Sequence, residues 1–182
     1  MSAARVKGSP RPPRETREAV ELVDRFAILD DTHRELMLQL TWLQQLLADL
    51  NGYEIPEVDR AIARQALKFF NENARQHHAE EEARVFPQLL QSSDATLVHQ
   101  VQRLQQDHGW LEEDWLELGP MLADLAEGHV GVDLDSLRHA LEVFTTLYHE
   151  HVSLEESLIY PAAKRQQAAD EAARARRLAA PA

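Results

Sequence analysis

The sequence of residues 97–125 is LVHQVQRLQQDHGWLEEDWLELGPMLADL, and its periodicity decides the fold class. Its apolar residues, with one histidine among them, recur at spacings of three and four positions: Leu97, Val101, Leu104, His108, Leu111, Trp115, Leu118, Leu122 and Leu125. This spacing places one stripe of side chains on a single face of a long helix, as in the helices of a bundle. Gly119-Pro120 interrupts the stretch, but the stripe stays in phase across it, so we expect a kink there and not a helix end.

Three further stretches show helical spacing. Residues 29–50 carry one stripe, residues 62–85 a looser one, and residues 134–158 another that is as regular as the first. Residues typical of turns separate these stripes: Asn51-Gly52 with Pro56, Ser92-Ser93-Asp94, and Gly128 to Asp133. Four helices joined by short loops predict an all-α fold, an antiparallel up-down four-helix bundle. A short extra helix is expected before the bundle, at about residues 18–26.

Charge divides the chain of 182 residues into three parts. Residues 1–17 and 164–182 are basic, whereas residues 18–163 carry the acidic excess behind the net charge of -12. We therefore expect a disordered, flexible basic tail over 1–17, one folded domain over 18–163, and an alanine- and arginine-rich tail or helix extension over 164–182. A domain this acidic repels phosphates and anionic lipids, which argues against nucleic acid or a membrane as a partner.

The chain contains no cysteine. This excludes disulfides, thiolate zinc sites, iron–sulfur clusters and cysteine nucleophiles. Pro10, Pro12 and Pro13 stand where a secretory signal would need an apolar run, and no segment approaches the roughly 18 apolar residues of a membrane span. The sequence therefore predicts a cytoplasmic protein.

One motif occurs twice in the chain. Residues 76–87, QHHAEEEARVFP, align without a gap on residues 150–161, EHVSLEESLIYP, and both read His-x3-Glu-Glu-x3-aromatic-Pro. A histidine on the preceding helix, His33 or His108, opens each half of the chain. The repeat indicates a duplicated helical hairpin.

Four histidines replace apolar residues in the stripes, one in each predicted helix: His33, His77, His108 and His151. At 1.5 Å of rise per residue, all four fall within about one helical turn of a single layer of the bundle. Glu81 and Glu155 each follow a histidine by four positions, so each pair shares a helix face. A carboxylate without a partner in an apolar core costs several kcal/mol, and two of them beside four imidazoles require cations.

These six side chains predict a site for two metal ions. Four imidazole nitrogens and two carboxylates are too many ligands for one tetrahedral zinc ion, but they suit two octahedral first-row ions with the carboxylates bridging them. Nitrogen and oxygen ligation without sulfur favours iron or manganese, although zinc or copper could bind the same ligands.

This array of His33, His77-x3-Glu81, His108 and His151-x3-Glu155 resembles the hemerythrin-like HHE cation-binding domain, over roughly residues 28–163. The resemblance implies a non-haem centre of two iron ions with an oxo or hydroxo bridge and two carboxylate bridges. Oxygen-carrying hemerythrins use five histidines, whereas the symmetric set of four histidines and two glutamates is similar to the family's stress-response branch. That branch includes proteins linked to iron–sulfur cluster repair, to nitric oxide or peroxide handling, and to iron sensing. The repair proteins usually carry an N-terminal domain with cysteine, which this sequence lacks.

Three functional hypotheses follow. The first is a di-iron protein that binds or reacts with a small oxidant (O2, H2O2 or NO), in oxidative or nitrosative stress or in iron homeostasis. The second is an iron storage or sensing module that signals to a partner without turnover. The third is a purely structural bundle. A carrier, a sensor and a peroxidase use the same ligands, so the motif does not decide whether the protein is an enzyme.

Several other side chains lie near the predicted ligands in sequence or on the same helix faces. Glu112 shares a helix face with His108 and is interpreted either as a labile ligand or as a solvated glutamate. Tyr148 is interpreted either as a donor to a metal-bound oxygen or as a core aromatic. His78 and His149 neighbour ligands in sequence but are expected to point about 100° and 200° away from them around their helices, outside the site. The remaining histidines are expected at the surface or in loops: His99, His129 and His139.

Overall fold

The computed structural model describes residues 14–50, 55–129, 131 and 133–179, which are helical apart from short connections. The helices are α1 (Arg14–Asp49), α2 (Glu57–Phe69), α3 (Arg75–Arg84), α4 (Phe86–Leu89), α5 (Ala95–Glu127), α6 (Leu134–Leu154) and α7 (Tyr160–Ala179). Single π-helical turns join α2 to α3 (Phe70–Ala74) and α6 to α7 (Glu155–Ile159). The prediction of an all-helical fold is confirmed, and no strand occurs among these residues.

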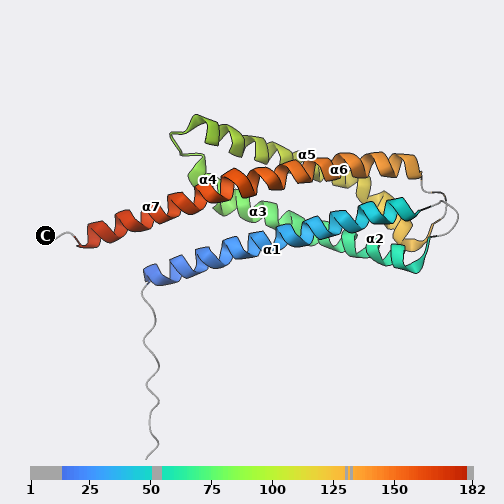
Figure 1. Cartoon of the computed structure of the whole chain (residues 1–182), viewed down its shortest axis with the longest axis horizontal. Coiled ribbons are helices and arrows are strands. Elements are labelled where there is room, and N and C mark those ends of the chain that lie inside the picture. The colour runs from blue at the N-terminus through green and yellow to red at the C-terminus, as the bar shows by residue number, and fades with distance from the viewer. Residues whose placement is uncertain (1–13, 51–54, 130, 132, 180–182) are drawn as a thin grey trace, which may run out of the picture.

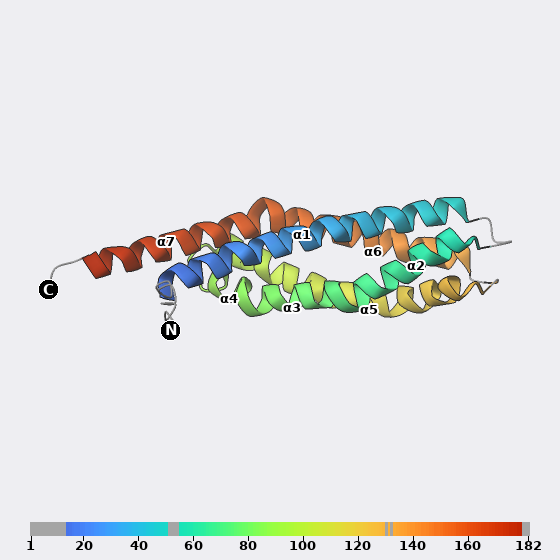
Figure 2. The ribbon, with the colours of Figure 1, turned by 90° about the horizontal axis from the view of Figure 1, so that it is seen from below.

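The helices form an elongated bundle of four long segments (Figures 1 and 2). The second segment is α2 continued by α3, and the fourth is α6 continued by α7. α1 contacts α2 and α6, and α5 contacts the same two helices, so each segment has two neighbours around a central core. In both views α7 extends beyond the rest of the bundle. None of the described helices combines the length and apolarity that a membrane span requires.

The ends of the chain are more helical than the sequence predicts. The helix expected at residues 18–26 is part of α1, which begins at Arg14 and so includes the last residues of the predicted tail. Of the two interpretations of the C-terminal region, helix extension applies up to Ala179, because α7 runs on without a break. Residues 1–13 and 180–182 of the two predicted tails lie outside the described residues.

Local side-chain chemistry sets the limits of α5 and α6. The Asp94 carboxylate accepts from the backbone N–H groups of Thr96 and Leu97 at the start of α5, and Asp133 caps α6 in the same way. Gly128 ends α5 with φ +81°, a left-handed conformation that favours glycine. α5 continues through Pro120, as expected. The predicted turn at Asn51-Gly52 lies outside the described residues.

The core consists of two apolar clusters with a polar layer between them. The larger cluster includes Leu36 and Leu111, and the smaller one includes Leu29 and Leu104. On α1 the buried His33 lies between Leu29 and Leu36, and on α5 the buried His108 lies between Leu104 and Leu111. The fold therefore holds a layer of histidines and carboxylates away from solvent by packing leucine and aromatic side chains on both sides of it.

Candidate metal centre

The structure brings all six predicted ligands together in this polar layer. They come from four segments: His33 from α1, His77 and Glu81 from α3, His108 from α5, and His151 and Glu155 from the α6–α7 junction. Their donor atoms form two groups, each with all atoms within 4.8 Å of one another. His33 and His77 belong to one group and His108 and His151 to the other, while Glu81 and Glu155 belong to both. We name these groups the α1/α3 half-site and the α5/α6 half-site.

The two carboxylates each direct one oxygen toward each half-site. Glu81 Oε1 lies 3.5 Å from His77 Nε2, and Glu81 Oε2 lies 3.5 Å from His108 Nε2. Glu155 Oε2 lies 3.1 Å from His33 Nε2, and Glu155 Oε1 lies 3.1 Å from His151 Nε2. His33 Nε2 and His77 Nε2 are 3.0 Å apart. This is the arrangement in which a carboxylate can bridge two neighbouring cations.

Several polar atoms of the layer have ion-pair contacts but no hydrogen bond. Glu81 and Glu155 are 0% exposed. Among the described residues, no hydrogen bond reaches Glu81 Oε2, either carboxylate oxygen of Glu155, or the Nε2 atoms of His108 and His151. Buried polar groups are nearly always paired, because an unpaired one costs several kcal/mol. A cation bound among these oxygens and nitrogens would satisfy them, so the residues fit a metal site.

Burial and mutual charge shift the pKa values of the cluster strongly. Burial lowers the pKa of His77 to about 3, and the neighbouring His33 adds to that effect. Burial raises the pKa of Glu81 to about 7, and the charge of Glu155 raises it further. Burial alone would lower the pKa of His151, but Glu155 and Asp107 outweigh it and raise the pKa to about 10. Perturbed pKa values of opposite sign in one cluster are typical of functional sites.

Outer carboxylates are hydrogen-bonded to two of the histidines, His33 and His108, and a third carboxylate lies near His151. His33 Nδ1 lies 3.2 Å from Glu156 Oε1, and His108 Nδ1 lies 2.8 Å from Glu82 Oε1. His151 Nδ1 lies 3.9 Å from Asp107 Oδ2. A carboxylate that accepts the Nδ1–H of an imidazole leaves Nε2 free as a metal ligand and increases its basicity. Glu82 and Glu156 were not predicted as part of the site, although each is the second glutamate of its repeat and directly follows a predicted ligand.

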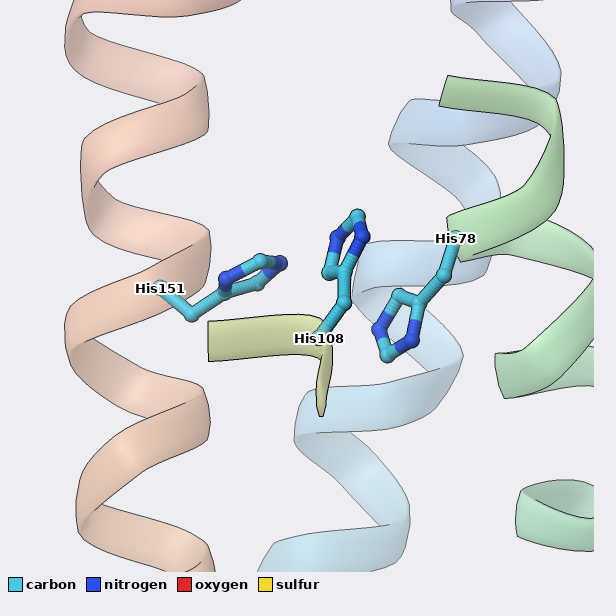
Figure 3. A group of neighbouring side chains, drawn as sticks. All are labelled: His78, His108 and His151. Atoms are coloured by element: carbon cyan, nitrogen blue, oxygen red, sulfur yellow. The ribbon is translucent and has the colours of Figure 1, made fainter. Parts of the chain in front are cut away.

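His78 lies in the cluster, so the prediction that it points away from the site is wrong. It is 4% exposed, and its ring is stacked on that of His108 with centroids 4.0 Å apart. His78, His108 and His151 form a third group of possible metal ligands, shown in Figure 3. His77 and His78 both follow the π-helical turn at Phe70–Ala74, and both side chains are buried in the polar layer. The other four histidines are exposed: His99, His129, His139 and His149.

Tyr160 is a second member of the site that the sequence analysis missed. Its hydroxyl donates to Glu81 Oε1 and lies 3.2 Å from His33 Nε2, and its ring is stacked on that of His33. The π-helical turn that begins at Glu155 precedes Tyr160 directly. Tyr148, which the sequence analysis considered instead, is buried in the larger apolar cluster with Phe70 and Phe144, and its ring centroid is 6.4 Å from that of His151.

A cavity of about 200 Å³ lies where the Phe70–Ala74 turn and α3 face α5 and α6. Its lining is mainly apolar and includes Phe70, Leu111 and Trp115, while His78 and Tyr148 also line it. Glu112, considered as a labile ligand, lines the cavity as well, but it is exposed and belongs to none of the groups of possible ligands among the described residues. The cavity therefore ends beside His78, and none of the six predicted ligands is among its lining residues.

A helical bundle whose four segments supply buried histidines and carboxylates to one layer is a cation-binding bundle domain. Residues 24–163 match the family model of the hemerythrin HHE cation binding domain, and the chain belongs to this family. A stretch of 95 residues is 35% identical to a protein of Haemophilus influenzae (strain ATCC 51907 / DSM 11121 / KW20 / Rd) that is described as uncharacterized. This stretch covers 52% of the chain and 52% of that relative. No solved structure is significantly similar to the chain.

Proposed function

We propose that this protein binds two iron ions between its two half-sites and that the iron-loaded protein binds or reacts with a small oxidant: O2, H2O2 or NO. The observation that carries the proposal is the orientation of Glu81 and Glu155, each of which directs one oxygen to each pair of histidines. Imidazole and carboxylate ligation without sulfur suits iron, and manganese or zinc are the alternative metals. Bound iron would supply one-electron chemistry by changing between its ferrous and ferric states.

The side chains around the half-sites have distinct parts in this proposal. Glu156 and Glu82 hold the rings of His33 and His108 with Nε2 directed at the half-sites. The Tyr160 hydroxyl holds a proton against Glu81 Oε1, which fixes the orientation of that carboxylate. The apolar clusters on both sides of the layer exclude bulk water, so an oxidant must enter by a defined route.

The cavity supports a small and uncharged substrate. Its volume of about 200 Å³ and its largely apolar lining suit a molecule of two to four atoms better than a charged metabolite. The up-and-down antiparallel order of the four segments is part of the proposal, because it brings a ligand from each segment to one level. A role in oxidative or nitrosative stress or in iron homeostasis is part of it as well.

The test is to load metal-free protein with ferrous iron without oxygen and to record absorption spectra after adding O2, H2O2 or NO. We expect a spectral change with at least one oxidant in the wild type and in His99→Ala, which alters an exposed histidine of α5. His108→Ala, on the same helix, should bind less iron and lose the change. Protein that holds iron but shows no spectral change with any of the three would contradict the proposal.

A second candidate function is iron sensing or storage without turnover. It is favoured by the full burial of the Glu81 and Glu155 carboxylates, because a fold that buries charge around a metal is more stable with the metal bound. Limited proteolysis of the metal-bound and metal-free protein tests it. Sensing predicts strong protection that depends on iron, whereas identical cleavage patterns in the two states would argue against it.

A further inference from the structure

A surface groove between α5 and α6 has no part in the metal centre. Its volume is about 600 Å³, and it is lined by two residues of α5 and six of α6: Trp110, Asp114, His139, Glu142, Val143, Thr146, Leu147 and Glu150. Trp110 is 46% exposed and Val143 is 44% exposed. Exposed aromatic and branched apolar side chains that line one groove are typical of a protein–protein contact. We name this feature the acidic groove.

The acidic groove carries negative charge without a matching positive charge. Glu150 is bound to Arg103, but Asp114 and Glu142 have no ion pair among the described residues. The pKa of Asp114 is raised by burial and by the charges of two further glutamates of α5. No lysine or arginine is among the lining residues. The groove therefore suits a partner that combines positive charge with a small apolar surface.

The outer part of α7 has these properties. α7 extends beyond the rest of the bundle in Figures 1 and 2, and residues 164–179 are exposed or half-buried. They include five basic and two acidic side chains, a net charge of +3. Four exposed residues recur at spacings of four, three and four and so share one helix face: Arg165, Ala169, Ala172 and Arg176. We name this the cationic face of α7. Helices gain most of their stability from packing such a face on a partner.

The acidic groove and the cationic face lie on the same side of the segment formed by α6 and α7. Val143 and Ala169 are 26 positions apart, and the π-helical turn Glu155–Ile159 between them holds one residue more than an α-helical turn. About 25 α-helical steps of rotation remain, which is about seven full turns at ~3.6 residues per turn. The two side chains therefore point in nearly the same direction. Along the axis they are about 39 Å apart, at ~1.5 Å per residue.

We propose that this protein forms a two-fold symmetric dimer in which α7 of each copy lies in the acidic groove of the other copy. One copy cannot bring its own α7 to its own groove, because both belong to the same straight segment. Two copies whose α6–α7 segments run antiparallel place each cationic face over the partner's groove. This inference concerns a surface and does not rest on iron binding.

The two surfaces match in length and chemistry. The groove extends along α6 from His139 to Glu150 and the cationic face from Arg165 to Arg176, a span of 11 positions in each case. The alanines between the two arginines have small side chains, so α7 can approach the exposed Trp110 closely. Two-fold symmetry forms the contact twice and leaves no groove open for a third copy.

Disulfide cross-linking tests the pairing directly, because the chain has no cysteine of its own. Val143→Cys and Ala169→Cys proteins are purified separately, mixed and oxidised. We expect a covalent dimer of the two variants in the mixture and none from either variant alone, since equal positions lie about 39 Å apart in the antiparallel dimer. The control mixture is Val143→Cys with Glu171→Cys, which alters an exposed residue on the other side of α7. It should form little covalent dimer.

Charge reversal tests the role of the ion pairs by sedimentation velocity. Wild type should have twice the mass of one chain, and Arg165→Glu/Arg176→Glu should raise the dimer dissociation constant by about tenfold or more. Arg174→Glu/Arg177→Glu makes the same change of net charge away from the cationic face and should remain a dimer. Adding Asp114→Lys/Glu142→Lys to Arg165→Glu/Arg176→Glu should restore the dimer. Circular dichroism checks that each variant is helical.

The results bear on this inference alone. A monomeric wild type, or cross-linking no greater than in the control mixture, would overturn the dimer. A dimer that persists unchanged in Arg165→Glu/Arg176→Glu would overturn the part assigned to α7, and assemblies larger than two would overturn the two-fold exchange. Metal-free protein gives these answers, so they are independent of whether the centre binds iron.

Discussion

Replacement of Glu81 by glutamine should change the stability of the protein in opposite directions with and without metal. Glu81 is 0% exposed, and burial raises its pKa from 4.5 to about 7 in the folded metal-free protein. Because the pKa of Glu81 is higher in the folded state, its protonated carboxyl contributes fully to stability below pH 4.5. This contribution is lost as the pH rises through about 7. At about 1.4 kcal/mol per pH unit, ionised Glu81 costs about 3 kcal/mol at pH 8.

Glutamine has a similar shape, still accepts from the Tyr160 hydroxyl, and does not ionise. Metal-free Glu81→Gln should therefore be more stable than wild type at pH 8 by up to about 3 kcal/mol, a rise in Tm of roughly 6 to 12 °C. The gain should shrink as the pH falls and nearly vanish at pH 4.5, where the folded-state carboxyl is protonated and the unfolded-state carboxyl is half protonated. Thermal and urea unfolding in the presence of a chelator measure both values, with Glu113→Gln on the exposed side of α5 as the control.

With iron present the sign should reverse. A neutral amide is a poor bridging ligand, so Glu81→Gln should bind less iron and lose the stabilisation that bound metal gives the wild type. A metal-free variant that is less stable than wild type at pH 8 would refute the argument that Glu81 is a strained buried carboxylate. A variant that binds and is stabilised by iron as well as wild type would refute its role as a ligand.

Three further predictions concern the metal-free protein. The pKa of His77 is lowered to about 3, so the contribution of His77 to stability is present above pH 6.5 and is lost as the pH falls. Between pH 7.5 and pH 5.5 the free energy of unfolding of wild type should therefore fall by about 1.4 kcal/mol relative to that of His77→Leu. Urea unfolding at the two pH values measures this, and a constant difference between the two proteins would contradict it. Tyr160→Phe should lose about 1 to 2 kcal/mol because it removes the hydroxyl that donates to Glu81, and a smaller loss than in Tyr148→Phe would count against that hydrogen bond. Leu118→Ala in the core should lower the free energy of unfolding by about 2 to 5 kcal/mol. Leu116 is 76% exposed on the same helix, so Leu116→Ala should change this free energy by less than about 0.5 kcal/mol. Equal losses would contradict the assigned core face of α5.

The six predicted ligands could be found from the sequence because they obey regular helix geometry. His77 and Glu81 are four residues apart within α3, and no irregular turn separates them. His33 and His108 lie within uninterrupted stretches of α1 and α5, so counting residues along a straight helix places them at the right level. Leucines one turn before and after His33 and His108 identify the buried face of each helix.

His78 and Tyr160 could not be placed by the same reasoning. Tyr160 follows a π-helical turn, Glu155–Ile159, which rotates the residues after it relative to a straight helix. His78 is the residue directly after His77, and the layer accommodates both rings because His77 packs against His33 and His78 packs against His108. No short sequence pattern predicts a π-helical turn, since such a turn forms where tertiary packing favours an extra residue in the helix. The outer carboxylates of Glu82 and Glu156 were within reach of sequence reasoning, because both repeats preserve the Glu-Glu pair.

The proposed centre consists of two metal ions that lie between Glu81 and Glu155. The most direct test is anomalous diffraction at the iron absorption edge, measured from crystals of the iron-loaded protein. The account predicts two iron peaks about 3.5 to 4 Å apart. One should be bound by His33 and His77 and the other by His108 and His151, with a carboxylate oxygen of Glu81 and of Glu155 at each. A single peak, or iron only at exposed acidic residues outside this layer, would contradict the account.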